Sequence, residues 1–177
     1  MTNLEIFTGF HVPRETENKL LRFKELLTRE AERQNLIARA TIANVDERHI
    51  LDAAQLLRFA PNAGPWLDIG SGGGLPGIVV SILSDHPMTL VEPRRLRAEF
   101  LARVVADLNL RHVNIEQRRV EQVEGRYSVI TARAVAALPK LFQMAEHLAT
   151  PETIWVLPKG RGGANELADA QRTWQGR

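Results

Sequence analysis

Four glycines occupy five positions of one short segment, and an acidic residue stands two places ahead of the first glycine. Glycine has no side chain, so such a segment allows a ligand to lie against the backbone or allows positive φ angles. A tight structural turn needs only one or two glycines, so four of them favour a ligand site. The segment reads Trp66-Leu67-Asp68-Ile69-Gly70-Ser71-Gly72-Gly73-Gly74-Leu75-Pro76-Gly77.

An acid also ends the next apolar run, because Glu92 follows residues 88–91, eighteen residues past Gly74. In doubly wound sheets an acid at the end of the second strand accepts hydrogen bonds from both ribose hydroxyls of an adenosine. We therefore predict that Glu92 binds the ribose of an adenosine cofactor. The alternative is an exposed carboxylate at a strand end that binds no ligand.

Two adenosine cofactors fit the glycine segment to different degrees. The nicotinamide fingerprint Gly-x-Gly-x-x-Gly can be forced onto residues 72–77. S-adenosylmethionine is favoured, because Asp68 begins the spacing Asp-x-Gly-x-Gly-x-Gly with Gly70 and Gly72. Its carboxylate can orient the loop and meet the ammonium group of the cofactor. No Gly-Lys-Ser/Thr follows, which excludes a nucleotide phosphate loop, and one domain leaves little room for a dehydrogenase's separate substrate domain.

The elements that position these residues alternate between strand and helix after a turn-rich segment at 61–65. Such alternation predicts the α/β class, with a mostly parallel sheet covered on both faces through right-handed crossovers. The expected helices cover residues 78–83, 96–108 and 138–148. The expected strands cover residues 66–69, 88–91, 113–116, 127–131 and 154–157.

Apolar residues at helical spacing fill the first sixty positions. They predict helices within residues 14–34 and 45–57, with Asn44 as the cap of the second and a connector at 35–40. We predict two parts of the chain, a helical extension at residues 1–60 packed on a core formed by residues 61–177.

Composition excludes several classes of protein. The chain has 177 residues, 44% hydrophobic, and no cysteine, so disulfides, cysteine-bound zinc, iron–sulfur clusters and thiolate nucleophiles are excluded. No apolar run approaches the ~20 residues that span a bilayer, and no signal pattern begins the chain. We expect a single-domain cytoplasmic protein with no membrane partner and no metal.

The net charge of +2 conceals an arginine-rich stretch. Nine arginines stand against five acids between residues 94 and 133. Because arginine pairs with phosphate through two hydrogen bonds and stacks on bases, the excess mildly favours RNA as a partner. A GC-rich genome explains the overall preference for arginine over lysine equally well.

These residues together resemble the RsmG (GidB) family of bacterial methyltransferases, over about residues 15–165. The Leu-Pro-Gly that extends the glycine loop and the Arg48-His49-Ile50-Leu51-Asp52 segment are its most specific parts. The resemblance implies a Rossmann-like fold, S-adenosylmethionine as cofactor, and methylation of N7 of a guanine, guanine 527, in 16S rRNA or a small-subunit particle. Further matching segments are Asn35-Leu36, Glu92 with the arginines after it, Arg119-Val120-Glu121, Thr131-Ala132-Arg133-Ala134 and Pro158-Lys159-Gly160.

The resemblance also implies which residues contact the cofactor: Gly70, Leu75, Glu92, Val120, Glu121 and Arg133. Val120 as a core residue, and Glu121 as the ion-pair partner of Arg118 or Arg119, are the plainer alternatives. Arg133 follows the fourth strand, where its guanidinium could bind a carboxylate or RNA.

A second set of residues provides RNA-contact hypotheses: Asn35, Arg48, His49, Arg94, Arg95, Arg97 and Lys159. A solvated helix face is the commoner place for such a run of charges. His49 has an equally weighted alternative, a packing histidine whose ring is hydrogen-bonded by Asp52.

The sequence lacks two features that other kinds of base methylation need, and methylation at guanine N7 needs neither of them. Methylation of a pyrimidine at carbon 5 needs a cysteine nucleophile. Methylation of an exocyclic amine normally uses an Asn/Asp-Pro-Pro-aromatic motif, where this chain has residues 131–134 as Thr-Ala-Arg-Ala. Guanine N7 already carries a lone pair and no proton, so the reaction requires positioning rather than a general base.

Members of the family normally continue past a helix like residues 165–174 into two further antiparallel strands, whereas this sequence stops at Arg177. We therefore expect a sheet without those two strands and with an exposed edge. Two rival hypotheses remain: a methyltransferase-fold enzyme for a small molecule or protein, and an RNA-binding domain without catalysis.

Overall fold

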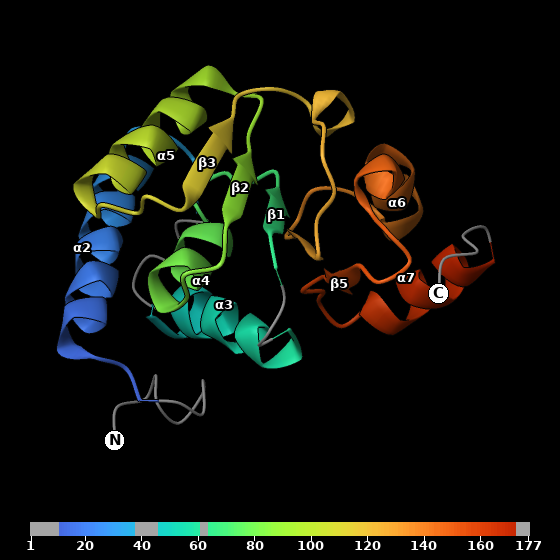
Figure 1. Ribbon diagram of the computed structural model, residues 1–177, viewed down its shortest axis with the longest axis horizontal. Helices are drawn as coiled ribbons and strands as arrows, with labels where there is room; N and C mark the ends of the chain where they lie inside the picture. The colour runs from blue at the N-terminus through green and yellow to red at the C-terminus, as the bar shows by residue number, and fades with distance from the viewer. Residues whose placement is uncertain (1–10, 38–45, 61–63, 173–177) are drawn as a thin grey trace.

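Five parallel strands form one sheet in the order β3-β2-β1-β4-β5 (Figure 1). The computed structural model describes residues 11–37, 46–60 and 64–172, without the side chains of 46–48. Its strands confirm the predicted α/β class. They are β1 (Trp66–Ile69), β2 (Met88–Val91), β3 (Val113–Glu116), β4 (Val129–Ala132) and β5 (Ile154–Val156).

Strand β1 lies at the centre of the sheet, and all four of its residues are buried. Asp68 pairs in register with Leu90 of β2 and Thr131 of β4. The strand order reverses between β1 and β4. In open α/β sheets ligands bind at such a reversal, outside the carboxyl ends of the strands. The glycine segment begins at this point.

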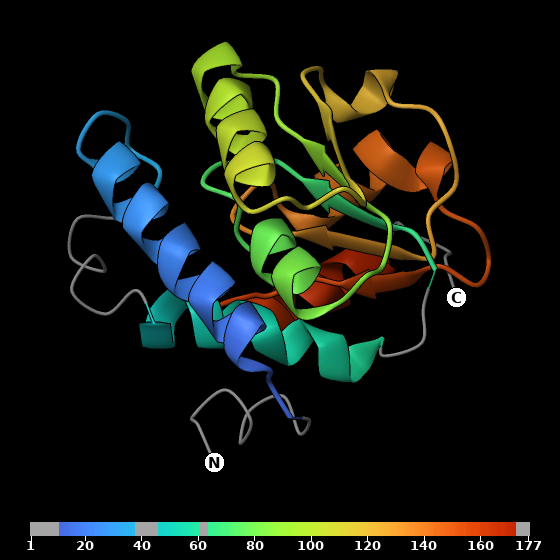
Figure 2. The same ribbon diagram turned by 60° about the vertical axis from the view of Figure 1, so that its left-hand side comes forward.

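Helices cover both faces of the sheet (Figures 1 and 2). On one face α2 (Arg14–Ala31), α4 (Gly77–Leu83) and α5 (Arg95–Asp107) share a hydrophobic core with Trp66. On the other, α6 (Leu138–Ala145) and α7 (Gly163–Gln171) pack with Leu67 and Ile69. This division follows from the alternation of side chains along β1.

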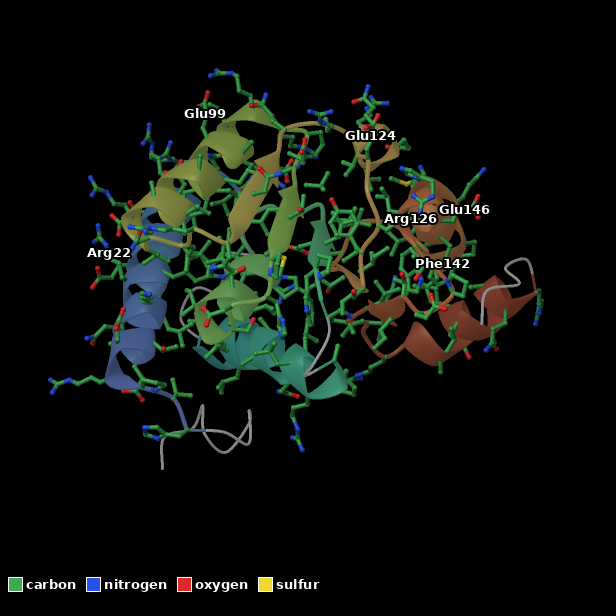
Figure 3. The ribbon with its side chains drawn as sticks, in the orientation of Figure 1. Arg22, Glu99, Glu124, Arg126, Phe142 and Glu146 are labelled. Atoms are coloured by element: carbon green, nitrogen blue, oxygen red, sulfur yellow. The ribbon has the colours of Figure 1, made fainter. Side chains whose placement is uncertain are left out.

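A charged contact joins α2 to α5 in addition to their packing (Figure 3). Arg22 donates to both carboxylate oxygens of Asp107, at 2.9 and 2.8 Å. Such two-point pairing between a planar guanidinium and a carboxylate has a defined geometry. The contact therefore links α2 to α5 at the surface, above the core that the two helices share.

The second helical segment changes its winding along its length. It is a π-helix over Asp46–Leu51, an α-helix over Asp52–Ala54 (α3) and a 3₁₀ helix over Gln55–Phe59 (η3). Four residues of this segment are buried, Ala53, Ala54, Leu56 and Leu57, whereas Phe59 is 67% exposed. The predicted cap Asn44 and most of the predicted connector lie outside the described residues.

Several predicted boundaries are displaced. Helix α2, which ends at Ala31, lies within the predicted range 14–34, and the amide of Arg33 then donates to the carbonyl of Glu30 in a tighter turn. Strand β4 begins two residues later than predicted, since the amide of Tyr127 donates to Leu148 instead. Helix α6 ends early and continues as the 3₁₀ turn η5 over Glu146–Leu148.

Strands β3 and β5 form the two edges of this sheet. Ile154 on β5 is 43% exposed. Among the helices described here, none has the length and apolar character needed to cross a membrane.

The fold predicts that the first helix contributes to the stability of the whole domain. Phe23 on α2 is fully buried in the core that also holds Trp66. We expect Phe23→Ala to lower the free energy of unfolding by about 3–5 kcal/mol, because it leaves a cavity. Urea unfolding followed by circular dichroism measures this free energy. The matched control Leu21→Ala, at a position 58% exposed, should change it by less than about 0.5 kcal/mol. Equal small losses in both variants would contradict a shared core.

Candidate active site

The glycine loop after β1 adopts a backbone that requires glycine. Gly70 and Gly72 have φ angles of 67° and 53°, in the left-handed region that side chains disfavour. A Cβ atom at Gly70 would lie 2.6 Å from a methyl carbon of Val135, so a side chain at this position has no room either. The loop thus brings bare backbone to the carboxyl edge of the sheet, as the sequence predicts.

The end of β2 holds this loop through backbone amides. Gly70 and Ser71 donate to the carbonyl of Val91 at 2.8 and 3.1 Å. The backbone amide of Gly72 donates to Glu92 Oε2 at 3.0 Å, and the backbone amide of Arg94 donates to Glu92 Oε1 at 2.9 Å. The buried Glu92 carboxylate therefore positions the loop while it faces the cavity above it.

Asp68 lies beneath the loop, where its side chain is almost completely buried. Its Oδ2 accepts a hydrogen bond of 3.1 Å from the amide of Gly77, the first residue of α4, and its Oδ1 has no partner. Burial raises the pKa of Asp68 to about 7, against the opposing effects of hydrogen bonds and of the positive charge on Arg133. Asp68 thus orients the loop and the helix after it.

A cavity of about 400 Å³ opens at this edge of the sheet, within the size range of small-molecule sites. It brings together the predicted cofactor residues Gly70, Glu92, Val120 and Glu121. The arginines predicted for RNA that border it are Arg94 and Arg97. The full lining is Ile69, Gly70, Val91, Glu92, Pro93, Arg94, Arg97, Arg119, Val120, Glu121, Ala134, Val135, Lys140 and Met144.

Sequence reasoning missed several residues of this lining, among them Val135, Lys140 and Met144. Val135 follows β4 and covers Gly70, while the other two belong to α6. Their position after the fourth strand was the only signal, because α6 reaches the cavity through its packing on the sheet. Arg118, one of the two arginines considered as an ion-pair partner of Glu121, pairs with Glu116 at 2.7 Å.

Four predicted cofactor residues are absent from this lining. Asp68 and Gly72 instead hold the shape of the glycine loop, through the hydrogen bonds Gly77 N–H to Asp68 and Gly72 N–H to Glu92. Leu75 is 7% exposed and packs in the core with α4. Arg133 faces a neighbouring cavity of about 260 Å³.

Arg133 contacts the N-terminal helices. Its Nη2 lies 2.6 Å from Nδ1 of the buried His49. Burial lowers the pKa of Arg133, while the charges of Asp52 and Asp68 oppose that effect. His49 is buried and its Nδ1 atom contacts Arg133, while a contact between His49 and RNA stays a prediction.

The other RNA candidates occupy varied places. Arg97 Nη2 donates to the carbonyl of Asn35 at 3.0 Å, which joins α5 to the segment after α2. Arg95 pairs with Glu99 one turn further along α5; Figure 3 labels Glu99 on that helix.

Lys159 also has protein partners, since Lys159 Nζ donates to Glu166 at 3.0 Å and to the carbonyl of Ala136 at 3.1 Å. The side chain of Arg48 lies outside the described residues. The described side chains contain no cluster of metal-ligating type.

Solved structures with this arrangement of elements are methyltransferases. One is the C-terminal domain of precorrin-6Y C5,15-methyltransferase from Rhodobacter capsulatus, with a TM-score of 0.55, 17% identity and 68% of each chain covered. Another is the glycopeptide N-methyltransferase MtfA in complex with S-adenosylmethionine, with a TM-score of 0.51 and 15% identity over 60% of this chain and 52% of that one. The fold is that of the Rossmann-like S-adenosylmethionine-dependent methyltransferases.

Sequence relatives identify the family within that class. A family model described as "rRNA small subunit methyltransferase G" (GidB) matches residues 16–177. The protein of that name from Novosphingobium aromaticivorans is 46% identical over 169 residues, covering 93% of this chain and 74% of its own. The one from Zymomonas mobilis is 43% identical, covering 93% and 79%. This chain belongs to the GidB family.

The burial of Asp68 predicts a pH-dependent stability. Its pKa of about 7 in the folded state exceeds the ordinary value of 3.8, so the folded protein binds an extra proton between these values. The free energy of unfolding should therefore fall as pH rises from about 4 to about 7, by an amount on the order of a few kcal/mol. Urea unfolding at a series of pH values measures this slope.

Asp68→Asn removes the charge and keeps an oxygen for the Gly77 amide, so its profile should be flatter over this interval. The exposed Asp85→Asn provides the matched control, with the wild-type slope. An unchanged slope in Asp68→Asn would contradict the assignment.

Proposed function

We propose that this protein transfers a methyl group from S-adenosylmethionine to N7 of a guanine in the 16S rRNA of the small ribosomal subunit. The observation that carries the proposal is the cavity of about 400 Å³ between the glycine loop and Glu92, in a member of the GidB family. Guanine 527 is the position that the family resemblance implies. A ribosomal substrate also agrees with the expected cytoplasmic location.

The residues around the cavity fit this cofactor. Glu92 receives one backbone amide on each oxygen, and a carboxylate oxygen accepts about two hydrogen bonds. Capacity therefore remains for the ribose hydroxyls. Val120 and Glu121 on the 3₁₀ turn η4 (Val120–Gln122) present an apolar surface and a carboxylate for the adenine. S-adenosylmethionine supplies, when bound, an electrophilic methyl group on a positively charged sulfur.

The chemistry at guanine N7 requires no proton transfer by the protein. Its lone pair is already available, so the protein contributes by holding the base in line with the methyl group. The acids that line the cavity are Glu92 and Glu121, and the proposal uses both for binding. We assign no general base and no metal.

Four basic residues border the cavity: Arg94, Arg97, Arg119 and Lys140. A cofactor with a positively charged sulfur gains little from four cations, whereas RNA phosphates gain much. We propose that this basic rim binds the phosphates of the rRNA around the target nucleotide. Asn35 contributes by holding Arg97 through its carbonyl.

The proposed cofactor site predicts the effect of two substitutions. Glu92→Ala should weaken S-adenosylmethionine binding by about 100-fold or more, because the ribose loses hydrogen bonds to a charged group. Gly70→Trp should abolish binding, because a Cβ at this position already meets Val135. Calorimetry measures affinity, and thermal unfolding confirms that each variant is folded. Exposed Glu152→Ala is the control with wild-type affinity.

Activity is tested with radiolabelled S-adenosylmethionine and small subunits from cells that lack the modification. Label should appear in 16S rRNA as 7-methylguanosine with the wild-type protein and fall in parallel with cofactor affinity in Glu92→Ala. If the wild type binds the cofactor yet leaves the RNA unlabelled, the proposed function is wrong.

The basic rim predicts a change in salt dependence. Removing one phosphate contact should weaken RNA binding at all sequences and reduce the slope of log affinity against log salt by about 1. We expect this for Arg119→Ala in filter-binding assays with 16S rRNA. Arg111 precedes β3 at the opposite edge of the sheet, so Arg111→Ala should keep the wild-type slope. The same slope in both variants would exclude Arg119 from the interface.

A further inference from the structure

A second cavity, of about 260 Å³, lies beside the proposed cofactor cavity at the same edge of the sheet. The N-terminal segment forms one side of it with Asp52 of α3 and Phe59 of η3. Loops after three strands form the other side, with Pro76 after β1, Arg133 after β4 and Lys159 after β5. The second cavity therefore combines an acid, two cations and an aromatic ring.

One short stretch of chain separates the two cavities. Arg133 lines the second cavity, while Ala134 and Val135 line the cofactor cavity. Ala134 has a φ angle of 56°, in the left-handed region that residues other than glycine seldom adopt, so the chain turns between the two cavities. A group bound against Arg133 would thus be close to a cofactor on the other side of a single residue.

We propose that the second cavity is the subsite for the target guanine base, an inference that rests on the proposed function. Arg133 donates to guanine O6. Asp52 accepts from the N1 and N2 amino hydrogens of the same edge. Phe59 stacks on the ring. RNA-binding proteins commonly read unstacked bases in this way, through hydrogen bonds to the edge and an aromatic surface.

The structure prepares both polar groups for this role. The guanidinium of Arg133 has five N–H donors, and the contact at 2.6 Å with His49 holds its position. Asp52 lies near enough to Arg133 to influence its pKa. One donor and one acceptor thus stand together on the wall of the second cavity.

This pairing selects guanine and aims its N7 atom. Guanine presents O6 as an acceptor next to amino hydrogens on N1 and N2, whereas adenine presents an amino group in place of O6. Adenine would therefore place a donor against Arg133 and an acceptor against Asp52. On guanine, O6 and N7 are neighbouring acceptors. A base held through O6 at Arg133 turns N7 toward the stretch that borders the cofactor cavity.

Phe59 provides independent support, because its ring is 67% exposed on the rim of the second cavity. Stacking of a base on such a ring increases binding by about 5- to 150-fold. Lys159 is paired with Glu166 at 3.0 Å and closes the rim without a direct role in base selection. The exposed ring and the two charged groups that line the same cavity match the face and the edge of a nucleobase.

The test replaces the target guanosine by inosine, which keeps O6 and N7 but lacks the N2 amino group. In 16S rRNA ligated with a single inosine, the wild type should show kcat/KM about 10- to 100-fold lower than with guanosine, because a hydrogen bond to a charged acceptor is lost. Asp52→Ala should methylate both RNAs at the same reduced rate. Phe59→Ala should lose activity on both, and Phe59→Tyr should restore it.

Cofactor affinity separates this subsite from the cofactor site. Asp52→Ala and Phe59→Ala should bind S-adenosylmethionine within about twofold of the wild type, and Asp169→Ala on α7 should match the wild type in every measurement. Retention of the full preference for guanosine in Asp52→Ala would overturn the subsite. A wild type that binds the cofactor but methylates no guanosine RNA would overturn the proposed function, and this inference with it.

Discussion

The glycine loop has to place bare backbone at the carboxyl edge of the sheet, and its amides still need hydrogen-bond acceptors. Strand β2 supplies them, through the carbonyl of Val91 and the carboxylate of Glu92. Buried amides without partners would destabilise the loop. The pairing therefore sets the floor of the cofactor cavity, and it keeps the charge of Glu92 compensated in a buried place. Every other part of the site is positioned relative to this contact between β1 and β2.

Two buried carboxylates have different structural roles around the glycine loop. Asp68 lies below and holds the start of α4, whereas Glu92 lies at the cavity. Burial disfavours a charged carboxylate, which raises the pKa of Asp68, with its unpartnered oxygen. The N-terminal helices complete the arrangement from above. A Cβ on Gly73 would meet Leu27 and Leu36 within 3.3 Å, so α2 and the residues after it pack directly on the glycine loop.

Prediction from sequence was most accurate where a pattern is local. The bounds of β1, β2 and β3 are confirmed to the residue, since short apolar runs between turns define buried strands. The meeting of Gly70, Glu92, Val120 and Glu121 at one cavity also follows from topology, because parallel strands end at the same edge. The winding of residues 46–59 was not predictable, because packing against the sheet rather than propensity decides it.

Local residue patterns were sufficient to predict the class of fold, the glycine loop, the acid after β2 and the family. These features depend on residue types at short spacing, and short spacing controls backbone conformation directly. Packing between distant elements brings Arg133 into contact with His49, 84 residues away in the chain, and places Leu75 in the core. It also places Lys140 of α6 at the border of the cofactor cavity. Such contacts arise when distant elements pack on the sheet, and no local pattern records which side chains then meet.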